Sequence, residues 1–270
     1  LVTINAASTG AITLNTTNGA LSGTAANLVL AFAGTVTEHT GTVTVTDAAT
    51  VAQFNTINAE TTQNVVLTGG VSDTAAAYAQ TDGTTTAGLT AIAAQDGDVA
   101  ITISDAPTVA QLVTINAATT GAITLTTANG ALSGTAANLV SAFAGTVTEH
   151  TGTVTVTDAA TVAQFNTINA ETTQNVVLTG GVSDTAAAYA QTDGTTTAGL
   201  TAIAAQDGDV AITISDEPTV AQLVTINAAT SGAITLSDTD GALSGTAANL
   251  VTAFAGDVTE HTGTVTVTDA

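Results

Sequence analysis

The chain has 270 residues, of which 22 are acidic and none is Lys or Arg, so its formal net charge is −22. Phosphate backbones and anionic lipid headgroups are bound by cationic side chains, so this composition argues against nucleic acid and anionic membranes as partners. The absence of Cys excludes disulfides and thiolate metal sites. No apolar run approaches the roughly 20 residues of a membrane span, so no membrane insertion is expected.

The sequence copies itself. The stretch GTVTVTDAATVAQ begins at Gly41 and recurs, letter for letter, at Gly152. With this offset, residues 1–111 form one copy, 112–222 a second, and 223–270 part of a third. A long fixed period is typical of solenoids, propellers and arrays, and because the chain opens and ends inside a copy we expect it to be a window on a longer protein. The first two copies differ at five positions: Ser8/Thr119, Asn15/Thr126, Thr17/Ala128, Leu30/Ser141 and Ala106/Glu217.

Four segments share one plan, which is an alternating stretch, a small polar residue and then an Ala-rich stretch. In chain order they are residues 43–54, 70–79, 101–112 and 131–140. Before the polar residue, apolar and polar side chains alternate, which predicts a strand with one buried and one wet face. After it, apolar residues recur at helical spacing, which predicts a short helix. We expect the strands to pair in parallel and each helix to start just after its polar residue.

The small polar residues serve as landmarks that divide the repeat into coils. They are Asp47, Asp73, Asp105, Gly134 and Asp158, at uneven spacing. A copy therefore holds four coils, each about as long as a leucine-rich repeat. The predicted fold class is α/β, a repetitive strand–helix solenoid whose coils bury their apolar faces against their neighbours. The alternative is an all-β solenoid or a string of tandem β-sandwich modules. The Thr and Val content favours that alternative, and the Ala-rich helical stripes oppose it.

An Asp directly before a helix predicts an N-cap. Its carboxylate accepts a hydrogen bond from a free backbone N–H, which is worth about 1 kcal/mol, and it faces the positive end of the helix dipole. We therefore assign a structural role as helix caps to six residues: Asp47, Asp73, Asp105, Asp158, Asp184 and Asp216.

Burial and turns are predicted from the same patterns. The pair Asn129-Gly130 predicts a tight turn with a small hairpin, and the polar stretch 81–85 predicts a surface loop. Four large apolar side chains are expected in the core and two histidines at the surface: Phe32, Phe54, Leu112 and Phe143 inside, His39 and His150 outside.

No set of residues points to catalysis, so the chain is not expected to be an enzyme. The TEHTG stretches pair a Glu with His39, His150 or His261 without a nucleophile nearby, and we interpret them as solvated turns. Two short acidic stretches resemble pieces of calcium loops but lack the full EF-hand pattern. They make calcium the one possible cofactor and divalent cations possible partners, with four weak candidate ligands: Asp96, Asp98, Asp238 and Asp240.

The hydroxyl side chains of the strands suggest a binding face. If the coils stack, these residues form a regular grid that suits ice or crystalline polysaccharide. An ordinary wet strand face is the plainer interpretation, and the stretch 67–70 interrupts the grid. The residues concerned are the pairs Thr44/Thr46, Thr102/Ser104 and Thr124/Thr126.

The repeat texture resembles that of giant secreted and cell-surface proteins of marine bacteria, including the cell-surface protein type needed for swimming in marine cyanobacteria. The resemblance spans the chain and rests on the stretches VTVTDAATVAQFNTINAETT, ITISDAPTVAQLVTINAATTGAITL and ALSGTAANLVSAFAGTVTEHTG. It implies a structural, adhesive or surface-layer role. The glycine-rich calcium nonapeptides common in such proteins do not occur in this sequence.

The sequence therefore predicts a structural, acidic fibre or coat segment at the cell surface or outside the cell. Its expected partners are neighbouring repeats of the same chain, or other copies of it. A chain without Lys or Arg offers trypsin-like proteases no cleavage site, which fits an exposed location. An adhesin or crystal-surface binding module that uses the Thr rows is the alternative function.

Overall fold

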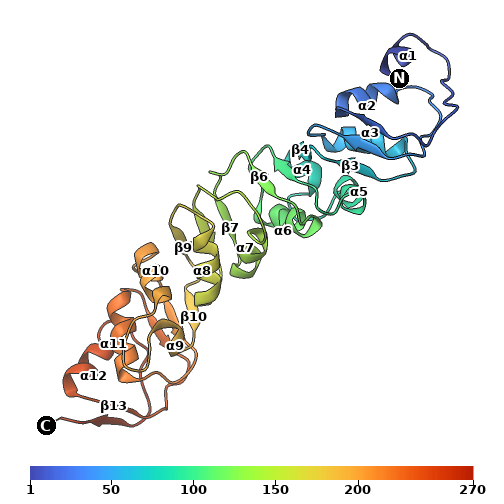
Figure 1. Cartoon of the computed structure of the whole chain (residues 1–270). Helices are drawn as coiled ribbons and strands as arrows, with labels where there is room; N and C mark the ends of the chain where they lie inside the picture. Colours follow the sequence, from blue (N-terminus) through green and yellow to red (C-terminus); the bar gives the residue numbers. More distant parts are fainter. Residues whose placement is uncertain (270) are drawn as a thin grey trace. The chain divides into compact units, whose positions relative to one another are not determined.

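The computed structural model describes residues 1–269. It divides into two compact units, one of residues 1–130 with 141–148 and the other of residues 131–140 with the chain from 149 onward. Each unit is α/β, with short parallel strands that alternate with helices (Figure 1). This confirms the predicted class of alternating strands and helices. The β-sandwich alternative is wrong, because every pair of named strands is parallel.

Unit 1 holds two three-stranded sheets, ordered β1-β2-β3 and β4-β5-β6. Its strands and helices alternate along most of the chain. In order they are α1 (Val2–Ala6), β1 (Leu21–Gly23), α2 (Ala25–Ala31), β2 (Val43–Val45), α3 (Val51–Ala59), β3 (Val65–Leu67), β4 (Val71–Asp73), α4 (Ala75–Tyr78), α5 (Ala87–Gln95), β5 (Ile101–Ile103), α6 (Val109–Ala118) and β6 (Ile123–Leu125).

Unit 2 holds sheets ordered β7-β8-β9, β10-β11-β12 and β13-β14. The residues of helix α7 (Ala136–Ala142) are divided between the two units. The other elements of unit 2 are β7 (Leu132–Gly134), β8 (Val154–Val156), α8 (Val162–Ala170), β9 (Val176–Leu178), β10 (Val182–Asp184), α9 (Ala186–Tyr189), α10 (Ala198–Gln206), β11 (Ile212–Ile214), α11 (Val220–Ala229), β12 (Ile234–Leu236), β13 (Leu243–Gly245), α12 (Ala247–Ala253) and β14 (Val265–Val267).

Strand register shows how the chain stacks within unit 1. Val43 pairs with Val65, whereas Val71 pairs with Ile101. The connection from β4 to its neighbour β5 therefore uses a longer stretch of chain than the connection from β2 to β3. The longer step contains two helices, α4 and α5, and the loop between them. The uneven landmark spacing in the sequence therefore does not measure the stacking step. The chain also moves sideways from β3 to β4 without advancing along the stack, since Ala49 already bridges Val71.

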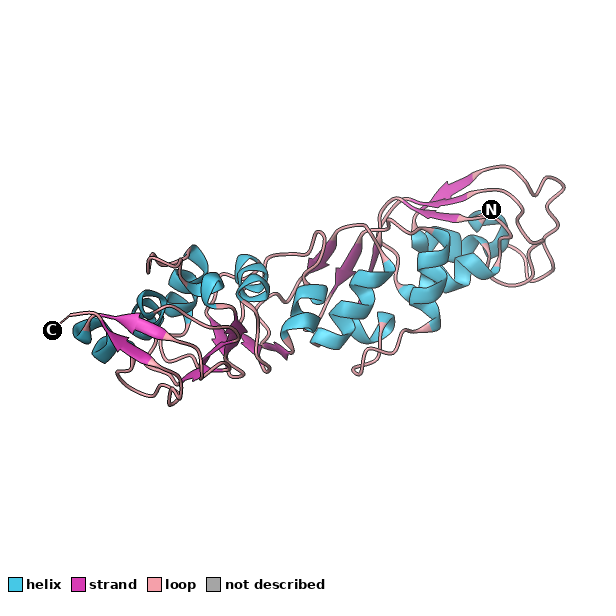
Figure 2. Cartoon of the chain, turned by 90° about the horizontal axis from the view of Figure 1, so that it is seen from below, coloured by secondary structure: helices cyan, strands magenta, loops and turns pink. Residues whose placement is uncertain are grey.

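The core lies between the strands and the helices, which occupy opposite sides of unit 1 (Figure 2). Inward strand residues such as Val43 and Val45 are fully buried, and so are Phe54 and Ile57 on α3. Burying apolar area in this way contributes about 25 cal/mol per Å². All four side chains predicted to be in the core are buried, as predicted: Phe32, Phe54, Leu112 and Phe143.

Tyr78 is the largest side chain in the core of unit 1 and is completely buried. Its hydroxyl donates a hydrogen bond to the carbonyl oxygen of Thr102, at 3.1 Å. Burial, together with the nearby Asp73 carboxylate, raises the pKa of the phenol far above its ordinary value. Tyr189 has the same arrangement in unit 2 and donates to Thr213 at 3.2 Å.

Glycine allows the backbones of neighbouring coils to touch. A Cβ atom built on Gly69 would overlap the carbonyl carbon and oxygen of Asp47. Gly69 does not have a positive φ, so the requirement for glycine is set by this approach and not by its conformation. In unit 2, a Cβ on Gly180 would overlap the backbone of Asp158 in the same way.

The two turn predictions have different outcomes. The stretch 81–85 is a surface loop, as predicted, and an antiparallel bridge between Ala79 and Thr85 closes it. The hairpin predicted around Asn129-Gly130 is wrong, because β6 pairs in parallel with β5, and β7 with β8. Asn129 is an exposed turn residue between two strands that belong to different sheets.

Candidate functional site

A Thr side chain caps the start of most helices in unit 1. Thr50 accepts a hydrogen bond from the backbone N–H of Gln53 at 3.1 Å, and the Gln53 side chain accepts one from the N–H of Thr50 at 2.9 Å. Thr108 and Gln111 form the same reciprocal capping box at the start of α6. The sequence TVAQ fits the pattern of a hydroxyl residue followed three positions later by Gln. The prediction that Asp caps the helix after it is therefore wrong, although the TVAQ signal is visible in the sequence.

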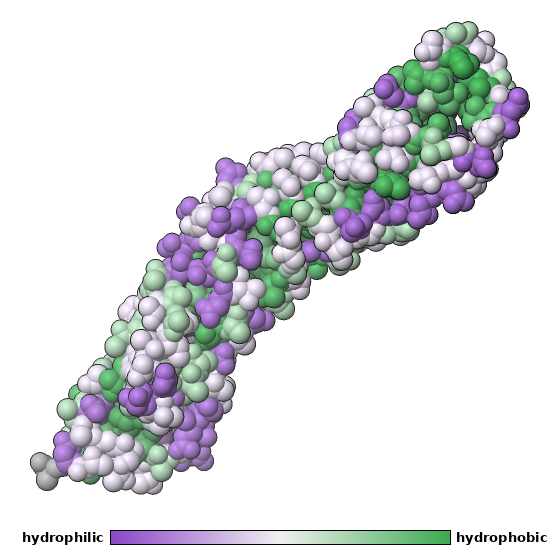
Figure 3. All heavy atoms as spheres, viewed as in Figure 1, coloured by the Kyte–Doolittle hydropathy of each residue, from purple (hydrophilic) through white to green (hydrophobic). Residues whose placement is uncertain are grey.

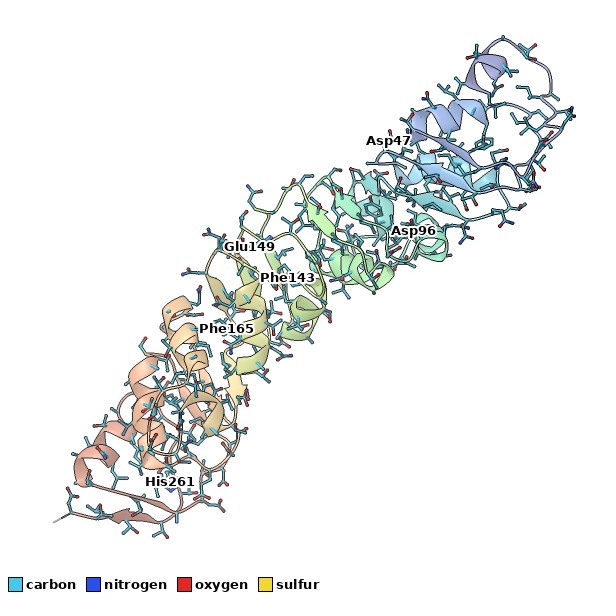
Figure 4. All side chains as sticks on the ribbon, in the orientation of Figure 1. Asp47, Asp96, Phe143, Glu149, Phe165 and His261 are labelled. Carbon is cyan, nitrogen blue, oxygen red and sulfur yellow. The ribbon has the colours of Figure 1, made fainter. Side chains whose placement is uncertain are left out.

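The landmark Asp residues reach back to the preceding coil. The Asp47 carboxylate accepts a hydrogen bond from the first N–H of α2, that of Ala25, at 2.7 Å (Figure 4). In the same way Asp73 accepts from Val51 at 3.1 Å, and Asp105 accepts from Ala75 at 2.7 Å. Each of these carboxylates therefore lies at the N-terminus of a helix that begins upstream of it in the chain. The helix that follows is capped by Thr or by no side chain.

Unit 2 repeats this geometry. The carboxylate of Asp158 accepts from Ala136 at 2.7 Å, and that of Asp184 accepts from Val162 at 3.1 Å. Asp216 accepts from Ala186 at 2.6 Å. All six Asp residues singled out from the sequence thus bind a helix N–H of the coil before their own. A helix dipole and an unpaired N–H both favour a carboxylate at that position.

Removal of one of these carboxylates is expected to destabilise unit 1 measurably. Asp73 accepts two N–H groups, from Val51 and from Thr74 at 2.8 Å. Asp73→Ala should lower the free energy of unfolding by about 2 kcal/mol, because both donors lose their acceptor. Denaturant titration monitored by circular dichroism measures this. Asp73→Asn keeps one acceptor oxygen and should lose clearly less, and equal losses in the two variants would contradict the hydrogen-bond explanation.

The histidine prediction is wrong. His39 and His150 are each only 2% exposed. The backbone of His39 bridges Thr61 in the next coil, and its ring lies beside Phe32, with ring centroids 6.3 Å apart. Among residues 1–269, neither ring nitrogen of His39 has a hydrogen-bond partner. The polar neighbours in TEHTG suggest a turn, whereas the stretch runs along the core, so His39 serves as an apolar filler.

Asp96 and Asp98 are predicted as weak calcium ligands. Asp96 follows α5, and its carboxylate accepts the N–H of Leu67 at 3.0 Å, at the open edge of β3 (Figure 4). The adjacent Gln95 side chain accepts the N–H of Val65 at 3.1 Å. Burial, and then the carboxyl of Asp98, raise the pKa of Asp96 above its ordinary value, while the Leu67 N–H opposes the rise. Asp96 therefore supplies a hydrogen-bond acceptor to a backbone N–H at the edge of the sheet.

Asp238 and Asp240 lie in the turn before β13. The Asp238 carboxylate accepts the backbone N–H of Asp240 at 3.3 Å. Within residues 1–269, no three His, Asp or Glu side chains are grouped so that they could hold a metal ion. Calcium binding at these four Asp residues therefore stays a prediction.

No family model, curated protein or solved structure matches this chain. Function is therefore inferred from the geometry. Among the helices of the described part of the chain, none combines the length and apolar character of a membrane span.

The outward face of the sheets is the remaining candidate site. In one sheet of unit 1, Thr44 is in register with Ser22 and Val66, and in the other Thr102 is in register with Ser72 and Thr124. None of these six central positions carries a charge, although the chain has 22 acidic residues. Both columns are therefore uncharged, but only the second consists of hydroxyl side chains throughout, because Val66 ends the first. Each is confined to its own three-stranded sheet, so the predicted Thr44 and Thr102 rows do not form one column.

Proposed function

We propose that the chain is a non-catalytic, structural repeat segment of an extracellular or cell-surface fibre. In this proposal the copies, such as 1–111 and 112–222, continue one another as a strand–helix solenoid with four coils per copy, each similar in scale to a leucine-rich repeat. Its main partners are the neighbouring repeats of the same chain. The 22 acidic residues and the absence of Lys and Arg support a location outside the cell.

The links between coils are the observation that carries this proposal. The hydrogen bond from the Ala25 N–H to the Asp47 carboxylate is 2.7 Å long, and it recurs from the Ala136 N–H to the Asp158 carboxylate, also at 2.7 Å. Asn5 adds a second link, since its side-chain amide donates to the carbonyl oxygens of Leu30 and Ala33 near the end of α2. The polar groups that the copies share in this way serve the stacking of one coil on the next.

Chains with one, two and three complete copies of the repeat test the proposal. In a continuous solenoid each added copy contributes its own stability and an interface with its neighbour. The melting temperature should therefore rise with copy number, and the maximum dimension from small-angle X-ray scattering should grow by a constant increment. Copies that melt at one temperature regardless of number would be independent modules, which overturns the proposal. Antibodies against the repeat should label intact source cells if the location is correct.

Binding to an ordered surface is a second candidate function. It is favoured by the uncharged, in-register hydroxyl column of Ser72, Thr102 and Thr124, because parallel strands space equivalent side chains at about 4.8 Å. The ligand would be ice or a crystalline polysaccharide. Thr102→Lys with Thr124→Lys should abolish inhibition of ice recrystallisation or co-sedimentation with cellulose or chitin. Thr90→Lys, on an exposed position of helix α5, is the matched control and should leave binding intact. Equal loss in both variants would contradict a role of the sheet face.

Salt is expected to stabilise the protein. A net charge of −22 without compensating cations makes the compact state repel itself. The Debye length falls from about 10 Å at 0.1 M salt to about 3 Å at 1 M. The melting temperature should therefore rise with sodium chloride. If calcium also bridges carboxylates, millimolar calcium should raise it more than sodium chloride of equal ionic strength. A melting temperature that is the same with and without either salt would show that electrostatic repulsion does not destabilise the folded state.

A further inference from the structure

Two Asn-Gly pairs occupy equivalent positions in the first two copies. They are Asn18-Gly19 and Asn129-Gly130, one full copy apart, and both Asn side chains are exposed. The third copy carries Asp240-Gly241 at the same place. The position therefore exists in an amide form twice and in an acid form once. The structural role proposed for the repeat does not use this difference.

The reacting groups of both pairs are free. Among residues 1–269, no protein group accepts a hydrogen bond from the N–H of Gly19 or Gly130, and neither Asn side chain is hydrogen-bonded. Asn5 and Asn116 differ, since the side-chain amide of each donates to three carbonyl oxygens. Gly19 also has open space around it, because a Cβ there would meet nothing within 4 Å. A glycine in this setting is the least hindered neighbour for an attack on the Asn side chain.

We propose that Asn18 and Asn129 are sites of spontaneous deamidation. The main-chain nitrogen of the following Gly attacks Cγ of the Asn, and the new C–N bond closes a succinimide ring. The side-chain nitrogen takes up the proton released by the main-chain N–H and leaves as ammonia. Water then adds to one of the two ring carbonyl groups and breaks one C–N bond. The product is Asp or isoaspartate, with no oxidant or reductant required and one negative charge added at each site.

The third copy shows that the Asp product fits the fold. At Asp240 the neighbouring contact is kept, since the N–H of Thr262 donates to the carbonyl oxygen of Thr239 at 2.7 Å. The matching contact beside Asn18 joins Thr40 to Thr17 at 2.8 Å. Deamidation to Asp therefore converts the first and second copies toward the charge pattern of the third. It changes charge without removing a contact.

Isoaspartate is expected to fit less well. It inserts one extra carbon into the main chain, and the main chain here is tightly packed. A Cβ built on Gly41 would lie 2.7 Å from the carbonyl oxygen of Asn18 and 2.6 Å from that of Gly19. An additional backbone atom at Asn18 therefore pushes against the next coil, whereas an Asp does not.

The test is peptide mapping of the complete, folded chain after incubation in mildly alkaline buffer. Trypsin finds no site, so a protease that cuts after Leu is used. It releases the peptides 15–21 and 126–132, which differ in sequence and contain Asn18 and Asn129. Both peptides should gain the mass difference between an amide and an acid. Peptides with Asn but without Asn-Gly should not change, and an unincubated sample corrects for conversion during digestion.

Gly19→Ala supplies the internal control, because the open space and the negative φ at Gly19 accept a Cβ. This variant should lose the mass change in peptide 15–21 and keep it in peptide 126–132. A circular-dichroism melt identical to that of the parent chain shows that folding is intact. The proposal is overturned if neither parent peptide converts, if Gly19→Ala converts at the parent rate, or if other Asn peptides convert equally fast.

Discussion

Above pH 10, the free energy of unfolding of each unit should fall by about 1.4 kcal/mol per pH unit. Each unit buries one tyrosine, Tyr78 or Tyr189, and the pKa of each phenol is raised far above its ordinary value. The folded state therefore keeps its phenol proton at a pH where the unfolded state releases it. Stability is fully present below the ordinary tyrosine pKa of about 10 and is lost as the pH rises beyond it.

The chain makes this effect unusually easy to isolate. It has no Lys, Arg or Cys, so no other side chain titrates in the same range. Tyr78→Phe should remove the slope from unit 1 while costing about 1 kcal/mol at neutral pH, because the hydrogen bond to the Thr102 carbonyl oxygen is lost. Tyr189→Phe should remove the contribution of the second phenol, and in the double variant the free energy of unfolding should not depend on pH in this range.

Denaturant unfolding between about pH 8 and pH 11.5 measures the slope, and near-ultraviolet absorbance reports tyrosinate in the same samples. Tyrosinate should appear together with unfolding. Phenols that ionise near their ordinary pKa while the chain stays folded would show that the hydroxyl groups reach water. That result would contradict the burial of Tyr78 and Tyr189.

Gly69→Ala should be the most damaging small substitution in unit 1, with a loss of about 3 kcal/mol. The added methyl group overlaps the carbonyl group of Asp47. Backbone atoms cannot rotate away as a side chain can, so the neighbouring coil must shift. The shift would also disturb the Asp47 carboxylate at the start of α2. Chemical denaturation measures the loss.

Gly19→Ala is the matched control for this prediction. It makes the same chemical change at a position with no atom within 4 Å of the new Cβ. Its free energy of unfolding should stay within about 0.5 kcal/mol of the parent chain. Similar losses at both positions would mean that the cost comes from glycine flexibility and not from contact between coils.

Local sequence patterns predicted the strands and helices well, but they predicted poorly which side chains contact one another across coils. Alternation in Val43–Val45 and Ile101–Ile103 marked strands, and apolar spacing marked the helices that follow, because both signals are contained in a few consecutive residues. The partner of Asp47 is Ala25, in the coil before, and no local pattern encodes that separation. The same limit explains the wrong prediction for His39. Its sequence neighbours are polar and suggest exposure, whereas its ring packs on Phe32.

The mixed character of the surface also follows from the sequence. Short alternating strands and short helices leave hydrophilic, neutral and hydrophobic residues interspersed over the visible face (Figure 3). The sequence indicated wet strand faces, and the hydroxyl columns agree with that. It did not indicate that the columns stop after three strands, because the sideways step between β3 and β4 appears only once strand pairing is known.

The backward reach of the Asp side chains gives the chain a direction of assembly. Synthesis delivers the N-terminus first. When α2 emerges, the carboxylate of Asp47 that completes its first turn has not yet followed. The first helix N–H of each new coil thus lacks its carboxylate acceptor until the next coil has been synthesised. That next coil supplies the carboxylate, and its own helix N–H then depends on the coil after it. Folding in this order proceeds coil by coil from the N-terminus. A translational pause would leave only the most recent coil without its carboxylate acceptor.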